Sequence, residues 1–341
     1  CERCRPFAME ETHLKASVHI VKTLLTAVAL GVGSSAFAQA YPSRAVTLVS
    51  PFPPGGAADV VIRMLAQELG KEFGQSFVVD NRAGAGGAIG TSSVARATPD
   101  GYTLLLARVG SQAILPALQP SLSYKWDDFS FLGTLELNPY ICAVRKEAPY
   151  RSLADLVDRI KAQPGKLNYA TTGPATVLNL GPQMLFNVLG LGREAAMPIA
   201  YKGSGEALVA VLGGEVDFVC TNLAPIAGAV RDGRLRALVT TTPERLPDFP
   251  DVPTAREAGY PQLEKIIGWS ALYGPKGLPD DVVRVWRDAL ARIKDDAQWR
   301  EGTTRTGSLP YVLGPEQTRD YVRGQYEEYA RLGKLLDITL K

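Results

Sequence analysis

The chain has 341 residues, of which 46% are hydrophobic and 21% are charged, and its formal net charge is +2. This length accommodates two domains of ordinary size, and the hydrophobic fraction is typical of a globular protein with a full core. The 37 basic and 35 acidic side chains nearly balance. They leave no basic footprint for nucleic acid, so we expect no nucleic-acid partner.

Residues 1–40 differ from the rest and are interpreted as a secretory signal peptide with residues upstream of it. An apolar run, Ile20 to Val32, has basic residues, Lys15 and Lys22, at its start and is too short to span a bilayer comfortably. Ala36-Phe-Ala38 is an A-x-A cleavage site, and cleavage after Ala40 is the alternative. We therefore expect export to the periplasm; an N-terminal membrane anchor is the other interpretation.

Both histidines, His13 and His19, fall in this leader. The expected mature chain then lacks the residue needed for Ser-His and Cys-His nucleophilic catalysis and for most zinc sites. No convincing pair of acid and base appears either. The Gly-rich stretch after residue 83 fails the dinucleotide fingerprint, which requires glycine at Ile89. We expect no enzymatic activity, no catalytic residues, no metal and no cofactor.

Cys142 and Cys220 are the cysteines of the expected mature chain, and each lies in apolar sequence typical of the middle of a strand. Buried free cysteine behaves as a small hydrophobic residue, so we expect the two to be unpaired. A disulfide in an oxidising compartment is the alternative.

The stretch Leu48 to Asp59 predicts a buried strand, a Pro/Gly turn and the start of a helix that continues to Phe73. Gly55 and Gly56 lack a Cβ, so their amides can approach a ligand closely. The first N–H groups of the helix have no partner inside it and carry the positive end of its dipole. The unit is therefore a candidate anion-binding site.

The same device recurs along the chain. Predicted strands end in turns that carry Gly, Ser, Thr or Asn before a helix at residues 76–80, 102–107, 167–171, 197–201 and 216–221. Such alternation predicts parallel βαβ units, in which ligands bind outside the carboxyl ends of the strands. Longer strands near 138–145 and 266–273 are predicted to cross between two α/β domains, with a ligand cleft between them.

Several motifs occur in one order along the chain: Pro51–Asp59, Val79–Gly90, Pro99–Leu104, Leu208–Asp217, Asp251–Thr254, Glu257–Tyr260 and Gly268–Pro275. With them the chain resembles the Bug family, the extracytoplasmic solute receptors of tripartite tricarboxylate transporters. The resemblance covers essentially the whole expected mature chain. It implies a two-domain Venus-flytrap periplasmic binding protein of type II, with mainly parallel sheets flanked by helices and two crossing hinge strands. The expected domains are 41–139 with 268–341, and 140–267.

The resemblance also implies a function. The receptor would capture a small carboxylate (an amino acid, a di- or tricarboxylate or an aromatic acid) and deliver it to membrane permease subunits, and it is expected to be a monomer. A periplasmic sensor that presents its closed form to a signalling partner is the alternative, and an exported carboxylate-processing enzyme is a remoter one.

In the family, loops matching 52–59 and 85–87 hold the carboxylate largely through backbone amides, and loops matching 110–112, 172–176 and 201–204 complete the pocket. With two residues at strand ends, Arg108 and Asn222, the predicted ligand-binding set is Phe52, Gly55, Gly56, Ala57, Ala58, Asp59, Ala85, Gly86, Gly87, Arg108, Ser111, Gln112, Thr172, Gly173, Thr176, Tyr201, Gly203, Ser204 and Asn222.

Individual members of this set have competing interpretations. Arg108 either pairs with a second ligand carboxylate or is a solvated or domain-bridging arginine. A carboxylate at Asp59 would repel an anion, so it is expected to orient the turn through backbone amides, binding of a ligand amino group being the alternative. Thr172, Thr176, Ser204 and Asn222 are either ligand donors or ordinary helix caps.

The chain departs from the family at two places. Ser111-Gln112 stands where a Ser/Thr-His stretch is common, and Arg108 stands where a small polar residue is usual. Ala175 to Asn179 replaces a polar Gly-Thr-Ser-Ser-His stretch. We therefore expect a drier pocket floor on the second domain and a more positive one on the first.

Overall fold

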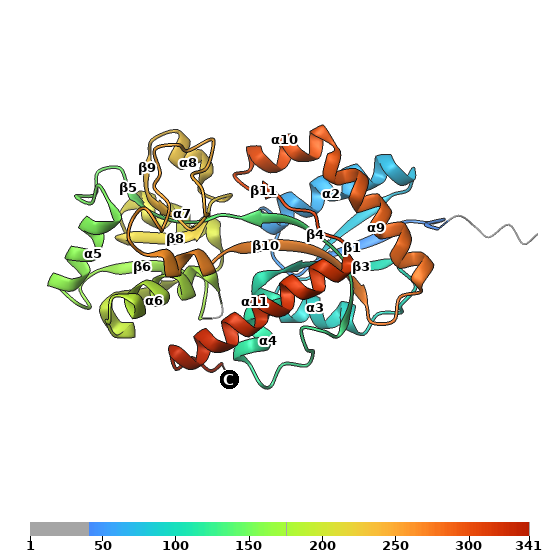
Figure 1. Cartoon of the computed structure of the whole chain (residues 1–341), viewed down its shortest axis with the longest axis horizontal. Coiled ribbons are helices and arrows are strands. Elements are labelled where there is room, and N and C mark those ends of the chain that lie inside the picture. The colour runs from blue at the N-terminus through green and yellow to red at the C-terminus, as the bar shows by residue number, and fades with distance from the viewer. Residues whose placement is uncertain (1–40, 175, 341) are drawn as a thin grey trace, which may run out of the picture. The chain divides into compact units, whose positions relative to one another are not determined.

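The computed structural model describes residues 41–174 and 176–340, so the predicted signal peptide lies outside the described residues. Within those ranges, no helix combines the length and the apolar character needed to cross a membrane. The chain forms two sheets flanked by helices (Figure 1). We call the six-stranded sheet with its helices the first lobe, and the five-stranded sheet with its helices the second lobe.

The sheet of the first lobe has the strand order β11-β4-β10-β3-β1-β2. Its strands are β1 (Val46–Ser50), β2 (Phe77–Asn81), β3 (Thr103–Arg108), β4 (Phe129–Asn138), β10 (Gly268–Pro275) and β11 (Leu309–Pro310). Its helices are α2 (Ala57–Phe73), α3 (Ala88–Ala95), α4 (Leu115–Leu118), α9 (Asp280–Asp295), α10 (Ala297–Arg305) and α11 (Pro315–Leu335), with the short turns η1 (Ala85–Gly87) and η2 (Gly110–Ile114).

The sheet of the second lobe has the order β7-β6-β8-β5-β9. Its strands are β5 (Tyr140–Arg145), β6 (Asn168–Thr171), β7 (Met197–Ala200), β8 (Phe218–Asn222) and β9 (Leu235–Thr240). Its helices are α5 (Leu153–Ala162), α6 (Val177–Val188), α7 (Ser204–Gly213) and α8 (Ala227–Arg231), and η3 (Arg193–Ala195) and η4 (Pro261–Lys265) are short turns.

The predicted βαβ units are present in both lobes. β1 pairs in parallel with β2 and β3, and β6 pairs in parallel with β7 and β8. The strands that pass between the lobes add antiparallel pairs, β10 with β3 and β4, and β5 with β8 and β9 (Figure 1). Both sheets are therefore mixed rather than mainly parallel, because a crossing strand runs against strands that point toward the crossing.

The strand register shows where the carboxyl ends of the strands lie. Arg108, the last residue of β3, is paired with Ser270 near the start of β10. Asn222, the last residue of β8, is paired with Tyr140 at the start of β5. Because β1 and β6 run parallel to β3 and β8, the loops that follow all four strands emerge at the ends of the sheets next to the crossing.

Helix α2 forms as its sequence predicts. Its buried residues Val61, Ile62, Leu65 and Leu69 repeat at helical spacing and pack on the sheet. Gly74 ends the helix in the left-handed region, with φ of 62°. Val60, an apolar residue of the same helix, is 41% exposed.

Where a longer crossing strand was predicted near residues 138–145, the structure has two strands, one in each lobe. Pro139 separates β4 from β5, since proline has no N–H to donate to a ladder. Its carbonyl accepts a hydrogen bond from the amide of Leu223, at 2.8 Å. This bend and the start of β10 at Gly268 are the two places where the chain crosses between sheets.

Helix α10 was not predicted from the sequence. The domain limits given above stay a prediction.

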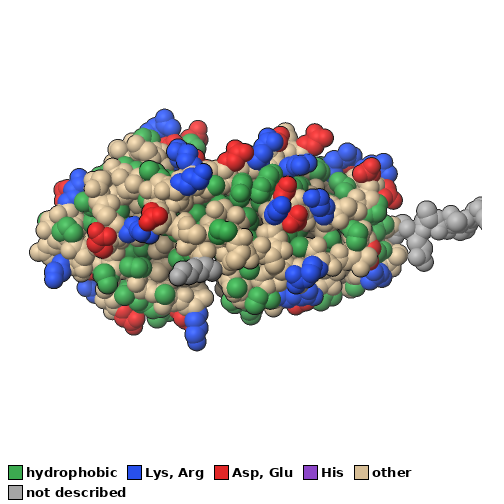
Figure 2. All heavy atoms as spheres, turned by 90° about the horizontal axis from the view of Figure 1, so that it is seen from below, with side chains coloured by type: hydrophobic (Ala, Val, Ile, Leu, Met, Phe, Trp, Pro, Cys, Tyr) green, Lys and Arg blue, Asp and Glu red, His purple; other side chains and the backbone are tan. Residues whose placement is uncertain are grey.

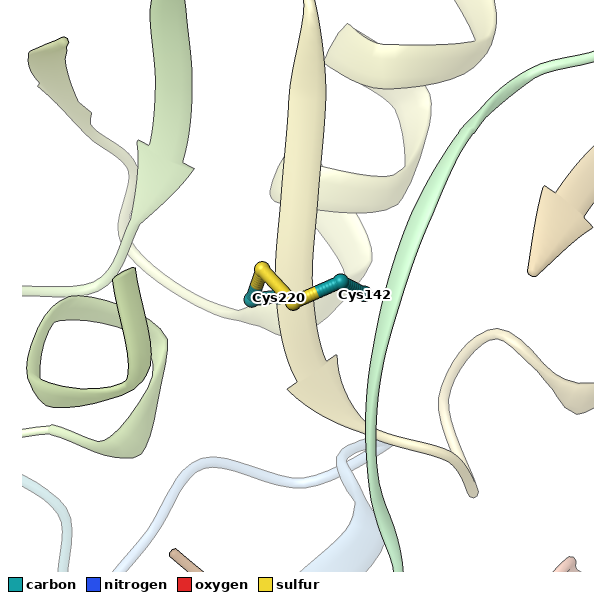
Figure 3. Close-up of a disulfide and its surroundings, with 2 residues drawn as sticks. All are labelled: Cys142 and Cys220. Carbon is teal, nitrogen blue, oxygen red and sulfur yellow. A yellow bond between two sulfur atoms is a disulfide. The ribbon is translucent and has the colours of Figure 1, made fainter. Parts of the chain in front are cut away.

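The prediction that the two cysteines are unpaired was wrong. Cys142 on β5 and Cys220 on β8 are direct partners in the antiparallel ladder, and a disulfide joins them (Figure 3). Their Cα atoms are 4.0 Å apart, which resembles the closer of the two kinds of antiparallel pair. The sequence showed two mid-strand cysteines, but the register that places them opposite each other arises only in the assembled sheet.

Candidate functional site

The turn between β1 and α2 presents unpaired backbone donors. Gly56 is the N-cap residue of α2 in an extended conformation, and Gly55 has a positive φ of 80°. Among the described residues, the N–H groups of Gly56, Ala57 and Ala58 have no hydrogen-bond partner. These three amides stand at the positive end of a 17-residue helix, as an anion site requires.

Asp59 holds this turn in place, as expected from its position. Its carboxylate accepts hydrogen bonds from the amide of Gly55 at 3.1 Å, from Arg63 Nε at 2.9 Å and from Asn81 Nδ2 at 3.0 Å. The Arg63 hydrogen bond, with the Gly55 and Asn81 bonds, holds the pKa of the Asp59 carboxyl below its usual range. Because the Gly55 amide is bonded to Asp59, it is not free for a ligand in this structure.

Two further loops of the first lobe pack against this turn. Gly87 has φ of 100°, and a Cβ there would lie 3.1 Å from Ser111 Cβ and 3.2 Å from Phe52 Cζ. Ala85 has an unusual positive φ of 48°, and Gly86 lies beside Leu115. The predicted residues of the loops after β1, β2 and β3 are therefore brought together, and the close approach explains the glycine at position 87.

Ser111 and Gln112 are fully buried in η2. The Ser111 hydroxyl donates to the carbonyl of Arg108 at 3.3 Å, and the Ser111 carbonyl accepts from the Tyr124 hydroxyl at 2.6 Å. Neither polar atom of the Gln112 side chain has a hydrogen-bond partner within the described protein. A buried amide without partners is costly, which makes Gln112 a candidate contact for a polar ligand.

Arg108 does not present a free cation. The residue is 7% exposed, and its guanidinium donates to Ser270 Oγ at 2.9 Å and to Asn138 Oδ1 at 2.6 Å. Glu136 Oε1 lies 3.5 Å from Arg108 Nη1 and neutralises it. Burial lowers the pKa of the guanidinium, and the carboxylate of Glu136 opposes that shift. Of the two interpretations of Arg108, these contacts favour the bridging one, and Glu136 compensates the charge that was expected to make the pocket floor of the first lobe more positive.

In the second lobe, the loop after β6 is held by local bonds. Thr171 Oγ1 accepts from the amide of Gly173 at 3.2 Å, and Thr176 Oγ1 donates to the carbonyl of Gly173 at 2.8 Å. Thr176 occupies the N-cap position of α6, but its side chain makes no capping bond. Thr172 is half-buried and has no hydrogen-bond partner for its hydroxyl among the described residues.

The loop after β7 leads into α7 with Gly203 as N-cap and Ser204 as first residue. The amide of Tyr201 donates to the carbonyl of Thr171 at 2.8 Å, which ties this loop to the loop after β6. Burial raises the pKa of the Tyr201 phenol, and nearby Glu215 adds to the shift. The amide of Ser204 has no partner among the described residues, so α7 offers a second helix N-terminus.

Asn222 lies beside the two places where the chain passes between the lobes. Its Nδ2 donates to the carbonyl of Asn138 at 3.1 Å, and its side chain lies over Gly268, where a Cβ would overlap that nitrogen. Glu136, Asn138 and Gly268 were not predicted from the sequence as functional candidates. A glycine within the strand predicted at residues 266–273 was the one available signal.

The charges on the surface shown in Figure 2 form no patch of one sign that would attract a charged ligand from a distance. In the view of Figure 2, basic and acidic side chains are interspersed with hydrophobic ones. One hollow of about 580 Å³ lies between Arg231 with Asp248 and residues 300–305, and another of about 250 Å³ lies between α2 and α10. Neither is lined by a residue of the predicted ligand set.

Two α/β lobes joined where the chain passes twice between the sheets form a fold of the flytrap type. The model of the family described as "Tripartite tricarboxylate transporter family receptor" matches residues 61–338, and the chain belongs to this family. The protein BugT of Bordetella pertussis is 34% identical over 316 residues, which cover 91% of this chain and 95% of BugT.

Solved structures of similar proteins support the same family and fold. The periplasmic binding protein BugD has a TM-score of 0.79 and 32% identity, covering 88% of this chain and 100% of BugD. MatC of Rhodopseudomonas palustris with bound malate has a TM-score of 0.77 and 32% identity, covering 86% of this chain and 99% of MatC. The predicted family and fold are thereby confirmed.

Proposed function

We propose that the protein captures a small carboxylate in the periplasm, in a cleft between the two lobes, and delivers it to permease subunits of a tripartite tricarboxylate-type transporter. The observation that carries this proposal is the set of unpaired N–H groups at Gly56, Ala57 and Ala58, on a strand-end loop beside the crossing. The amide of Ser204 at the start of α7 is the matching donor in the second lobe.

Electrostatics favours recognition by amides. Asp59 is occupied by Arg63 and Asn81, and Arg108 is occupied by Glu136, so these charges are compensated inside the protein. A hydrogen bond from an amide to a carboxylate contributes about 1.5–3 kcal/mol. A few such bonds in a dry site account for micromolar affinity, about −8 kcal/mol. The dicarboxylate malate, bound by the relative MatC, is a suitable first probe.

Closure of the two lobes on a ligand is part of this proposal, and the two connections between the sheets support it. A ligand that contacts both lobes favours the closed form through its higher affinity for that form. The bends at Pro139 and before Gly268 would act as hinges. They would separate residues 41–139 with 268–341 from residues 140–267. Export with cleavage near Ala38 or Ala40 belongs to the same proposal.

The first test is a thermal-shift screen of residues 41–341 against carboxylates, followed by calorimetry on the hits. A ligand at about 100 times its Kd adds about 2.7 kcal/mol to the free energy of unfolding. If no carboxylate raises the melting temperature, the proposal is wrong.

The second test removes one N–H group and leaves the helix intact. Ala57 is the first residue of α2, a position where proline is well tolerated and where no helical hydrogen bond is lost. We expect Ala57→Pro to weaken carboxylate binding about 10- to 100-fold, the loss of one charge-assisted bond. Ala297→Pro, at the same position of α10, is the control and should bind normally. Equal affinity of the Ala57→Pro protein and the control would exclude this amide as a ligand contact.

A further inference from the structure

A chain of buried polar side chains joins three strands of the first lobe next to the crossing. Arg108 on β3 donates to Ser270 on β10 at 2.9 Å and to Asn138 at the end of β4 at 2.6 Å. Ser270 in turn donates to Glu136 Oε1 at 2.8 Å. All four side chains are at least nine-tenths buried.

Asn138 connects this network to the second lobe. Its side-chain Nδ2 donates to Ser308 Oγ at 2.9 Å, within the first lobe. Its backbone carbonyl accepts from Asn222 Nδ2 of β8 at 3.1 Å. The residue that follows, Pro139, accepts from the amide of Leu223 at 2.8 Å. At the bend between β4 and β5, the Asn138 side chain is thus bound within the first lobe, and the backbone of Asn138 and Pro139 is bound to the second lobe.

The same arginine is directly connected to the candidate site. The Arg108 carbonyl accepts the Ser111 hydroxyl at 3.3 Å, and β3 runs straight into η2, which carries Ser111 and Gln112. A shift of η2 on ligand binding would thereby reach the residue that holds Asn138.

Stability alone does not account for this pair of charges. Burying an arginine and a glutamate has a desolvation cost that their attraction only roughly offsets, and apolar residues of similar volume often serve a core as well. The planar guanidinium offers something that apolar residues cannot, namely two fixed donors at a set angle. Here one donor contacts the returning strand β10 and the other contacts the last residue of the outgoing strand β4.

We propose that Arg108 is a positioning residue, which holds Asn138 at the bend between the lobes and couples the loop Gly110–Ile114 to closure. This inference rests on the proposed function for its effect on binding, whereas its effect on the bend is independent of any ligand.

The test compares the wild-type protein with an Arg108→Met, Glu136→Met double variant, which removes both charges and keeps similar volume. Arg108→Lys is the second variant. It keeps a positive charge but replaces the planar fork, whose two nitrogens contact Ser270 and Asn138 separately, with a single ammonium on a flexible stem. It remains informative if the double variant does not fold. Thr318→Val is the control, since it removes a different buried hydrogen bond to β4, from the amide of Thr134.

Hydrogen exchange without ligand gives the first readout. We expect the peptides around Tyr140 and Leu223 to exchange about tenfold faster in the Arg108 variants than in the wild type, and to be unchanged in the control. Unchanged exchange at both peptides in the Arg108 variants would overturn the proposal, whatever the protein binds.

Calorimetry with malate and with 2-hydroxybutyrate, a four-carbon monocarboxylate, gives the second readout. A positioning role predicts that both affinities fall by the same factor, about tenfold. A loss confined to malate would mean that the guanidinium contacts a second ligand carboxylate, and it would overturn the positioning role. If the wild-type protein binds no carboxylate at all, the proposed function fails and the exchange experiment still decides the inference.

Discussion

Reduction of the disulfide between Cys142 and Cys220 should destabilise the second lobe by several kcal/mol. The bond closes a loop with a sequence separation of 78 residues. In the chain-entropy model, −2.1 − 1.5R ln n gives about −15 cal/mol/K for a loop of this length, or about 4.5 kcal/mol at 25 °C. Measured disulfides typically contribute about 2–4 kcal/mol, so we expect a loss of about 3 kcal/mol or more.

The assay takes advantage of where the tryptophans lie. All four, Trp126, Trp269, Trp286 and Trp299, belong to the first lobe, so their fluorescence reports the unfolding of that lobe. Far-ultraviolet circular dichroism reports both lobes. In urea, a phosphine reductant should therefore shift the dichroism transition to lower denaturant and shift the fluorescence transition less.

The control is a Cys142→Ala, Cys220→Ala double variant, which should ignore the reductant and resemble the reduced wild-type protein. A loss below about 1 kcal/mol on reduction would refute the entropic reasoning, since the model assigns about 4.5 kcal/mol to the loop closed by residues 78 apart in the sequence. Identical shifts in both signals would instead show that the two lobes unfold as one unit.

Three further predictions concern Asp59, Gly268 and Ser152. The pKa of the Asp59 carboxyl is lowered in the folded state, so its contribution to stability should be present above about pH 4 and be lost as the pH falls through the folded pKa. The Asp59→Asn variant should lack this part of the acid dependence when denaturation is measured as a function of pH. Gly268→Ala places a methyl group against the Asn222 amide and should cost about 1–3 kcal/mol in urea denaturation, whereas Gly277→Ala, on an open but left-handed turn, should cost only the backbone strain. Ser152→Ala removes one half of the capping box of α5 and should cost about 1 kcal/mol by thermal unfolding, an unchanged melting temperature counting against the cap.

The order of strands, turns and helices was largely predictable, because apolar periodicity and Gly-rich turns are local patterns. The unit from β1 to α2 appears as expected, and so does the role of Asp59 in holding the turn. Facts that depend on register were not predictable. Cys142 and Cys220 looked like two separate strand interiors until the ladder placed them opposite each other.

Arg108 illustrates the same limit in the candidate site. A basic residue at the carboxyl end of a strand has the same local pattern whether it faces a ligand or the hinge. Its partners lie 28, 30 and 162 residues away in the sequence, at Glu136, Asn138 and Ser270. Only the assembled sheet shows that a strand returning from the other lobe supplies one of these partners.

The position of β10 has a consequence for biosynthesis. This strand lies between β3 and β4, so the middle of the first sheet is supplied by residues made after the entire second lobe. Until residue 275 has been synthesised, β3 and β4 each have an open edge, the type of edge that recruits other chains. A truncated product ending before Gly268 should therefore aggregate or be degraded rather than survive as half a receptor.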